Sequence, residues 1–172
     1  MRTATMGYAG RAQVHGAFGA APAMFRAVSN PPAARQAMWG FFGALGGGTL
    51  PAKLSEKIAV AVADRNRCHY CLAAHTLLGK NAGASAEEMA EAQAGRSTDP
   101  QTAAALGFAA KLVDRRADVS DADVQGLREA GFSDEAIVEI LAHVALNLFT
   151  NYVNIALDVP VDFPSVKLRQ AA

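Results

Sequence analysis

Apolar residues recur at helical spacing along most of the chain. The stretch from 50 to 67 shows the repeat, with apolar residues every three or four positions at Leu50, Leu54, Ile58, Ala61 and Val62. Such spacing places the residues on one stripe of an α-helix. No segment alternates apolar and polar residues with a period of two, so β-strands are not expected. The pattern predicts an all-α protein.

Capping residues divide the second half of the chain into separate helices. Ser85 and Glu88 form a capping-box pattern, in which each side chain can bond to the other residue's backbone N–H. Asp99 followed by Pro100 is typical of a helix start. The other boundaries rest on the same chemistry, with a helix after the cysteines ending at Gly83, one between Ser120 and Gly131, and a last one starting at Ser133.

The two ends of the chain carry weaker signals. "PAARQAMWGFFGAL" predicts a helix that starts after two prolines and ends in a run of three glycines, and "APAMFRAVS" predicts a shorter one. The tail 159–172 contains two prolines and is expected to be extended. No long linker or fixed-period repeat interrupts the sequence. We expect one domain over 1–172, with its core at 40–160 and residues 1–30 the least defined part.

Composition narrows the classes of function. A chain of 172 residues with 51% apolar and 19% charged residues can build a sizeable core. Its net charge is zero, so no global field favours nucleic acid or an anionic membrane as partner. Residues 1–55 contain no acid, and "GAFGAAPAMF" resembles a weak targeting segment, but Gly19 and Pro22 interrupt it. Because no uninterrupted apolar run reaches the ~20 residues that span a bilayer, we expect a cytoplasmic protein.

The segment "CHYCLAAH" holds both cysteines and two of the four histidines. Cys68 falls near the start of a predicted helix and Cys71 in its first turn. The backbone N–H groups and the positive end of the helix dipole stabilise a thiolate at that place. His75 lies one turn beyond Cys71 on the same face. Such a dithiol can act as a nucleophile and can close to a disulfide.

Glu56 lies on the preceding predicted helix, between Lys53 and Lys57. A carboxylate that packs beside a histidine can orient the ring and take its proton, as in an acid–base relay to a nucleophile. The residues also allow other interpretations. The cysteines, with His75 and Glu56, could form part of a zinc site, or they could be inert buried thiols. In the cytoplasm a permanent disulfide is the less expected outcome.

The spacing of these residues resembles a known family. Glu56, Cys68, Cys71 and His75 match the signature E-x11-C-x2-C-x3-H of the AhpD-like alkylhydroperoxidases, in the carboxymuconolactone decarboxylase superfamily. "HVALNLFTNYVNIALDVPVDFP" is similar to the C-terminal segment of its peroxidase-related branch, and the similarity covers about 40–160. The resemblance implies a single-domain helical bundle that assembles as a homo-oligomer, a trimer or hexamer. It also implies a thiol peroxidase that needs no haem, flavin or metal.

The resemblance further implies a role for each residue of the signature. Cys71 attacks the hydroperoxide substrate, and Cys68 resolves the sulfenic acid into a disulfide. Glu56 and His75 relay the proton. A dithiol protein or a small thiol then reduces the disulfide. Some relatives carry a histidine directly before the second cysteine, whereas this chain has Tyr70 there.

A few other polar residues are candidates for supporting roles. His143 is expected to be either a partner within the core or a second-layer contact to the site, and His69 and Tyr70 flank the cysteines. No function is predicted for His15 or Trp39. Three asparagines at i, i+4 and i+7 are interpreted as buried polar contacts or an oligomer interface: Asn147, Asn151 and Asn154.

Two alternatives to a peroxidase remain open at this point. The dithiol could sense oxidants or exchange disulfides with a partner protein without catalysing turnover. Less expected is a decarboxylase acting on a lactone acid, as in the relatives that give the superfamily its name. Those relatives lack the dithiol, so Cys68 and Cys71 argue against that activity.

Overall fold

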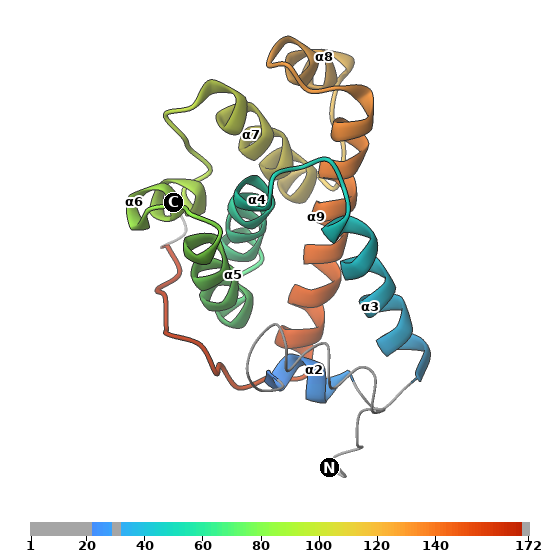
Figure 1. The fold of residues 1–172 in the computed structure, drawn as a ribbon, viewed down its shortest axis with the longest axis vertical. Helices are drawn as coiled ribbons and strands as arrows, with labels where there is room; N and C mark the ends of the chain where they lie inside the picture. Colours follow the sequence, from blue (N-terminus) through green and yellow to red (C-terminus); the bar gives the residue numbers. More distant parts are fainter. Residues whose placement is uncertain (1–21, 29–31, 170–172) are drawn as a thin grey trace.

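The computed structural model describes residues 22–28 and 32–169, which form helices and no strand (Figure 1). The all-α prediction is therefore confirmed for these residues. The targeting interpretation of the first residues and the position of His15 fall outside the described part of the chain. The helices are α2 (Ala23–Ala27), α3 (Pro32–Gly46), α4 (Ala52–Arg65), α5 (His69–Asn81), α6 (Ala86–Gln93), α7 (Pro100–Asp114), α8 (Asp121–Glu129) and α9 (Asp134–Ala156).

The predicted caps lie where the sequence indicated. Ser85 and Glu88 form both bonds of the capping box at the start of α6. Asp99 accepts a hydrogen bond from the backbone N–H of Thr102, with Pro100 at the first position of α7. Gly83 follows α5 with a φ of 89°, a left-handed conformation that glycine adopts without a Cβ clash.

One boundary differs in detail from the prediction, and one cap was not predicted. α3 begins at Pro32 itself and not after it. Proline fits the first turn of a helix, because an N–H group at that position would have no acceptor within the helix. α8 begins with a capping box between Ser120 and Asp123. The sequence did not predict this box because its usual pattern has Glu or Gln at the third position.

α4 is the central helix. Residues 58–63 are buried without interruption, so both sides of α4 contribute to cores. Val60 and Ala63 pack with residues of α2, α5 and the C-terminal tail. Ile58 and Val62 pack with apolar residues of α7, α8 and α9. Because α4 joins the two cores, the helices form one unit with the α4–α5 pair near its middle (Figure 1).

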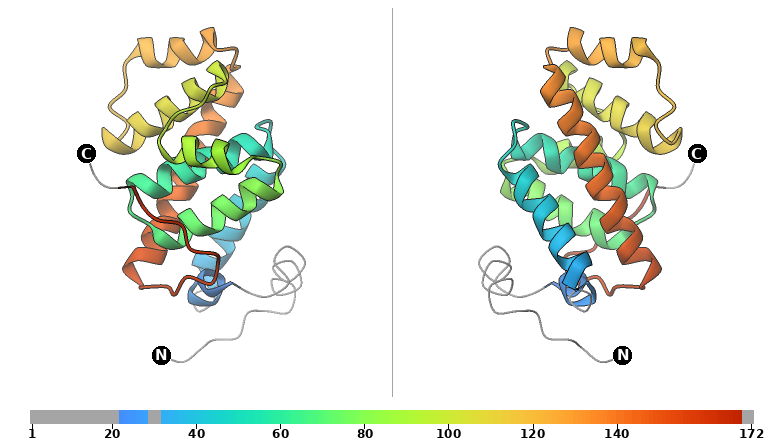
Figure 2. Two further views of the ribbon diagram at one scale, coloured as in Figure 1. Left: turned by 90° about the vertical axis from the view of Figure 1, so that its left-hand side faces the viewer. Right: turned by 90° about the vertical axis from the view of Figure 1, so that its right-hand side faces the viewer.

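α9 is the longest helix described and crosses α3 in the right-hand view of Figure 2. Among the described helices it alone is long and apolar enough, by length and composition, to cross a membrane. It packs against α3, α4, α5, α7 and α8. It also buries Asn147, Asn151 and Asn154, an arrangement typical of the core helix of a folded domain.

The chain after α9 forms neither helix nor strand through residue 169. It runs from the end of α9 past α5 toward α6 (Figures 1 and 2). Gln93 Nε2 donates to the carbonyl of Lys167 at 2.8 Å. Asp162 Oδ2 accepts from the backbone N–H of Ala23 at 2.7 Å. These bonds hold the tail against α6 and join it to α2, beside the dithiol.

Candidate active site

The two cysteines lie at the sharp joint between α4 and α5. Arg67 adopts a left-handed φ of 61° and turns the chain from one helix to the next. Cys68 is the N-cap of α5, and its Sγ accepts from the backbone N–H of Cys71 at 3.3 Å. Both cysteines are reduced and buried. The expected position at a helix N-terminus is confirmed.

The two thiols share their protons unequally. The pKa of Cys68 falls to about 7, because the Cys71 side chain donates a hydrogen bond to it, against the opposing effect of burial. The Cys71 backbone N–H and the charge of His75 lower this pKa further. The pKa of Cys71 rises, because its hydrogen bond to Cys68 holds the proton and because it is buried. The pair therefore loses its first proton near neutral pH, with the charge on Cys68.

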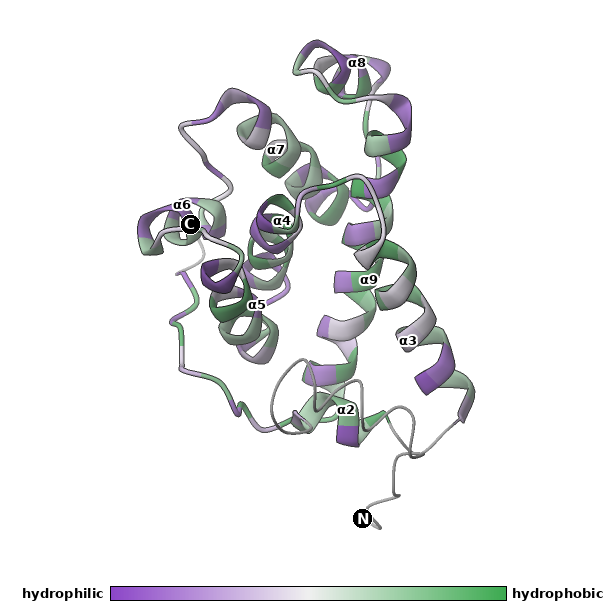
Figure 3. Cartoon of the chain, viewed as in Figure 1, coloured by the Kyte–Doolittle hydropathy of each residue, from purple (hydrophilic) through white to green (hydrophobic). Residues whose placement is uncertain are grey.

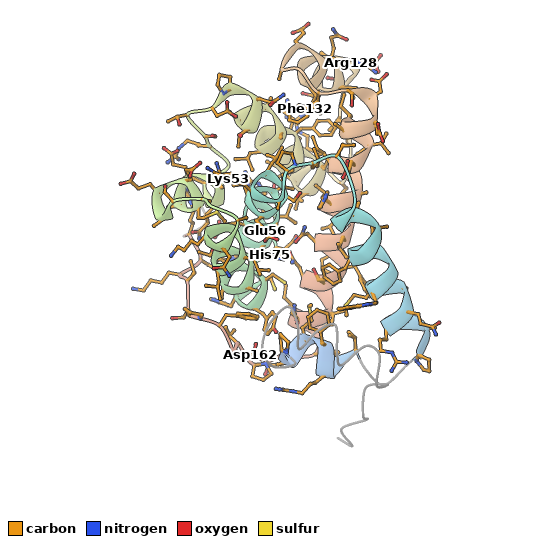
Figure 4. All side chains as sticks on the ribbon, in the orientation of Figure 1. Lys53, Glu56, His75, Arg128, Phe132 and Asp162 are labelled. Atoms are coloured by element: carbon orange, nitrogen blue, oxygen red, sulfur yellow. The ribbon has the colours of Figure 1, made fainter. Side chains whose placement is uncertain are left out.

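Glu56 and His75 contact each other across α4 and α5 (Figure 4). Glu56 Oε2 lies 2.7 Å from His75 Nδ1, and the two side chains are 22% and 17% exposed. The contact with the carboxylate holds the imidazole in one orientation. Sequence spacing alone left this contact undetermined. The arrangement can hold a proton next to the dithiol and deliver it.

An apolar cavity of about 270 Å³ lies beside this pair. Cys71, Glu56 and His75 line it, whereas Cys68 does not. A ligand in the cavity therefore lies against Cys71 and not against Cys68. The rest of the wall is mainly apolar and aromatic: Pro22, Met24, Phe25, Trp39, Phe42, Tyr70, Ala74, Leu78, Thr150 and Phe163.

The cavity wall comes from segments far apart in sequence. Phe25 of α2 packs edge-to-face on Trp39 of α3 at 5.6 Å between ring centroids. Phe163 of the tail packs in the same way on Tyr70 at 5.4 Å. Sequence analysis assigned no role to Trp39, because a lone aromatic residue on a helix carries no local signal of what it will face.

Glu56 and His75 also line a second cavity, of about 220 Å³. Its wall includes Ser55 and His143, and His143 Nε2 lies 3.5 Å from Ser55 Oγ. Burial lowers the pKa of His143. His143 therefore lines a cavity together with Glu56 and His75, whereas neither cysteine lines it.

His69 and Tyr70 have different surroundings. His69 is the first residue of α5, is exposed and lines neither cavity. Tyr70 is buried, and its hydroxyl accepts from the backbone N–H of Met24 at 3.3 Å. Burial raises the pKa of Tyr70. Within the described residues, no group of three or more His, Cys, Asp or Glu side chains is placed to hold a metal ion.

Asn154 is a site residue that sequence analysis did not assign to the chemistry. Its Nδ2 lies 3.1 Å from Cys71 Sγ and 3.2 Å from Met24 Sδ. Hydrophilic bands recur on the side of α9 that faces α4 and α5 (Figure 3). The regular asparagine spacing was the available signal, but it did not show which asparagine would meet a thiol.

The middle part of the chain matches the model of a known protein family. Residues 32–115 match the carboxymuconolactone decarboxylase family. The matched range contains Glu56, Cys68, Cys71 and His75, and excludes α2, α8, α9 and the tail. No curated protein matches the chain.

Solved structures with the same fold cover nearly the whole chain. A peroxidase-related protein from Silicibacter sp. TM1040 is 24% identical, with a TM-score of 0.80 over 88% of this chain and 82% of its own. An AhpD-core, peroxidase-related protein from Ralstonia eutropha JMP134 is 27% identical, with a TM-score of 0.79 over 90% and 84%. The debrominase Bmp8, in a complex with 2,3,4-tribromopyrrole, is 20% identical, with a TM-score of 0.78 over 94% and 92%.

Proposed function

From the premise that the chain is an AhpD-like member of the carboxymuconolactone decarboxylase superfamily, we propose that it is a thiol peroxidase that reduces organic hydroperoxides. One observation carries the proposal. A reduced Cys-x-x-Cys pair presents Cys71 to an apolar cavity that Glu56 and His75 also line. Nucleophile, proton relay and substrate space thus meet at one place.

In the first step the thiolate of Cys71 attacks the distal oxygen of the hydroperoxide. An S–O bond forms and the O–O bond breaks, so the sulfur is oxidised to a sulfenic acid while the peroxide is reduced. The leaving alkoxide needs a proton. The Glu56–His75 pair, with 2.7 Å between Oε2 and Nδ1, is placed to supply it from the imidazolium.

In the second step Cys68 attacks the sulfenic sulfur of Cys71. A disulfide forms, the sulfenic oxygen leaves as water, and the Cys68 thiol supplies one of the protons. The sum is two thiols and one hydroperoxide converted to a disulfide, an alcohol and water. A dithiol protein or a small thiol must then restore the pair, so we propose such a reductant as partner in the cytoplasm.

The cavity supports a hydroperoxide with a sizeable apolar group as substrate. Its wall is mostly apolar and aromatic, and its volume is about 270 Å³. Burying apolar surface contributes roughly 25 cal/mol per Å², a gain that hydrogen peroxide cannot obtain. Bulky organic hydroperoxides should therefore have a lower KM than hydrogen peroxide.

The test is peroxide-dependent turnover with a dithiol reductant, followed by mass spectrometry of the cysteines. We expect many turnovers per chain and a Cys68–Cys71 disulfide when the reductant is exhausted. A single oxidation with no turnover, under any dithiol reductant supplied, would instead favour a redox sensor or a disulfide-exchange protein. The metal content should be measured on the same samples, because stoichiometric zinc on the cysteines would contradict the proposal.

The same cavity supports a second candidate, reductive removal of bromide from a small aromatic ring. The structure of Bmp8 holds a tribromopyrrole, and this chain has an aromatic wall around its reactive thiol. Two thiols supply the two electrons: the aryl bromide becomes the arene, bromide and a proton are released, and the cysteines form a disulfide. Bromide release from brominated pyrroles, compared with hydroperoxide turnover by the same sample, decides between the two activities.

A further inference from the structure

Cys71 has an amide donor on the side that faces α9. Asn154 Nδ2 lies 3.1 Å from its sulfur, and the asparagine is 3% exposed. A hydrogen bond from an amide to a thiol is weak, because neutral sulfur is a poor acceptor, but to a thiolate it is charge-assisted and much stronger. The same Nδ2 lies 3.2 Å from Met24 Sδ, a weaker acceptor. The donor is therefore placed to favour negative charge on Cys71.

Asn151 lies one turn earlier on α9 and is fully buried. Its Oδ1 accepts from Asn66 Nδ2 at 2.8 Å, which fixes the orientation of the amide. Its Nδ2 is buried and has no hydrogen-bond partner among the described residues. An unsatisfied buried donor destabilises the folded protein. A partner that carries charge only during the reaction is a physical reason to retain such a donor. Asn151 and Asn154 both lower the pKa of Cys71.

In the reduced protein, one cysteine carries the negative charge and the other lines the cavity. The first negative charge of the pair lies on Cys68, whereas Cys71 is the cysteine that lines the apolar cavity. Attack from the cavity requires the proton of Cys71 to move to Cys68 along the hydrogen bond that joins them. Asn154 does not line the cavity, so its amide contacts the sulfur of Cys71 from outside the space that substrate would occupy.

We propose that Asn154 is a catalytic residue, whose side-chain amide donates to Cys71 Sγ and holds the charge of the dithiol on that sulfur during attack. Asn151, one turn earlier on α9, keeps a buried amide donor without a partner among the described residues. The inference rests on the proposed use of Cys71 as nucleophile. In the attack the sulfur gives two electrons to the distal oxygen, the O–O bond breaks, and the alkoxide takes its proton from His75. Asn154 exchanges no proton; its amide only stabilises the negative charge on the Cys71 sulfur.

Several other groups affect the charge on Cys71, and the experiment must hold them constant. On its own helix these are Cys68, Tyr70 and His75; α4 adds Glu56, and the tail adds Asp162 through its contact with Tyr70. None is changed in the variants below except Cys68, which is replaced in every sample so that one thiol remains to be titrated.

The test measures the pKa of Cys71 from the pH dependence of its alkylation rate in a Cys68→Ser background. Asn154→Leu should raise that pKa by about one to two units, because a hydrogen bond to a charged group contributes about 1.5–3 kcal/mol. At neutral pH the single-turnover reaction with a hydroperoxide should slow by roughly ten- to a hundred-fold. The rate should recover when the pH exceeds the new pKa, which a general packing defect would not produce.

Two further variants separate charge from shape. Asn154→Asp keeps the shape and places a carboxylate against the sulfur, so the pKa of Cys71 should rise at least as much as in Asn154→Leu. Asn147→Leu is the matched control. Asn147 is buried on the same face of α9, and its amide donates to the carbonyl of His143 at 2.9 Å. Its replacement should leave the pKa of Cys71 unchanged, and thermal unfolding of all variants reports on folding.

Each outcome decides the inference. A Cys71 pKa that is the same in wild-type, Asn154→Leu and Asn154→Asp backgrounds overturns it. An equal rise in Asn147→Leu also overturns it, because the effect would then be general packing. Alkylation needs no peroxide, so a raised pKa in a protein without peroxidase activity would support the amide donor while the proposed function fails.

Discussion

At the scale of single residues, the site assigns negative charge and substrate access to different sulfur atoms. Cys68 caps α5 and receives two hydrogen bonds from Cys71, one from its backbone and one from its side chain. Cys71 lines the cavity that substrate would enter. The lowered pKa of Cys68, taken alone, favours Cys68 as the nucleophile. The position of the cavity favours Cys71. We give more weight to the cavity, because a proton moves easily along a hydrogen bond whereas a buried sulfur cannot change its position.

The first prediction follows from that choice. Cys71→Ser should abolish the reaction with hydroperoxide, because the cysteine that lines the cavity is gone. Cys68→Ser should react once and accumulate a sulfenic acid on Cys71, because no resolving thiol remains. Trapping of the sulfenic acid with a dimedone-type reagent and mass spectrometry checks both results. Sulfenic acid on Cys68 in the Cys71→Ser protein, with none on Cys71 in the reciprocal variant, would reverse the roles.

The second prediction concerns the relay. Glu56→Gln keeps the shape of the side chain and removes its charge, so peroxide reduction should slow by roughly a hundred- to ten-thousand-fold. His75→Gln should do much the same, and the double variant should be far from additive because the two residues act as one unit. Melting temperatures should change little, since both side chains are partly exposed.

The pH dependence of thiolate formation distinguishes the relay from a merely structural histidine. In the wild-type protein the first thiolate should form near pH 7, the pKa of Cys68. The charge of His75 contributes to lowering that pKa, so in His75→Gln the curve should move to higher pH. If the curves of wild type, Glu56→Gln and His75→Gln superimpose, no relay to the dithiol exists.

At the scale of elements, α6 is joined to α4 by one carboxylate. Glu88 completes the capping box of α6, and it also contacts Lys53 Nζ at 2.7 Å and Lys57 Nζ at 2.8 Å. The Lys57 side chain is 6% exposed. Glu88 therefore neutralises the buried charge of Lys57 and also accepts a hydrogen bond from the backbone N–H of Ser85. Hydrogen bonds from Lys53, from Lys57 and from the backbone of Ser85 lower the pKa of Glu88 from 4.5 to about 2.

The third prediction is an acid dependence of stability. Because the folded pKa of Glu88 is the lower one, its contribution is complete above pH 4.5 and is lost as the pH falls toward 2. Glu88→Gln should lower the free energy of unfolding by roughly 1–3 kcal/mol at neutral pH, between the values of an exposed and a buried pair. It should also reduce the loss of stability between pH 4.5 and pH 2. Denaturant unfolding across that pH range is the measurement. Glu87→Gln, an exposed neighbour, is the control, and equal losses in both variants would contradict the prediction.

At the scale of the whole molecule, α9 presents an apolar face to the outside. Exposed residues on it include Val138 at 63%, Tyr152 at 61% and Ile155 at 48%. With Leu141, Ala145 and Leu148 they follow the alternating three- and four-residue spacing of a coiled-coil seam. The seam itself carries no charged residue, so a second copy of the chain can match it. We propose this face as the contact of the expected homo-oligomer.

The fourth prediction tests that contact. Val138→Glu combined with Tyr152→Glu should shift the protein to a smaller oligomer or a monomer, because charges would be buried in the seam without partners. Light scattering coupled to size-exclusion chromatography measures the mass. Ala90→Glu, an exposed substitution on α6, adds charge elsewhere and should leave the mass unchanged. A monomeric wild-type protein would exclude the assembly altogether.

The sequence by itself determined the features that depend on nearby residues. Caps such as Ser85 with Glu88 and Asp99 with Pro100, the glycine at 83, and the place of Cys68 at a helix start all follow from bonds within one or two turns. The spacing from Glu56 to His75 also pointed to one site, through resemblance to a family. These predictions need no knowledge of how distant helices pack.

Only the tertiary structure decided which distant residues meet the dithiol. The 2.7 Å contact of Glu56 with His75 depends on how α4 packs against α5. The cavity over Cys71 needs α2, α3 and the tail, and Asn154 lies 83 residues from Cys71 in the sequence. A periodic pattern shows that one face of a helix is buried, but it does not show which other element covers that face. For that reason Trp39 and Asn154 had no predicted part in the site that they complete.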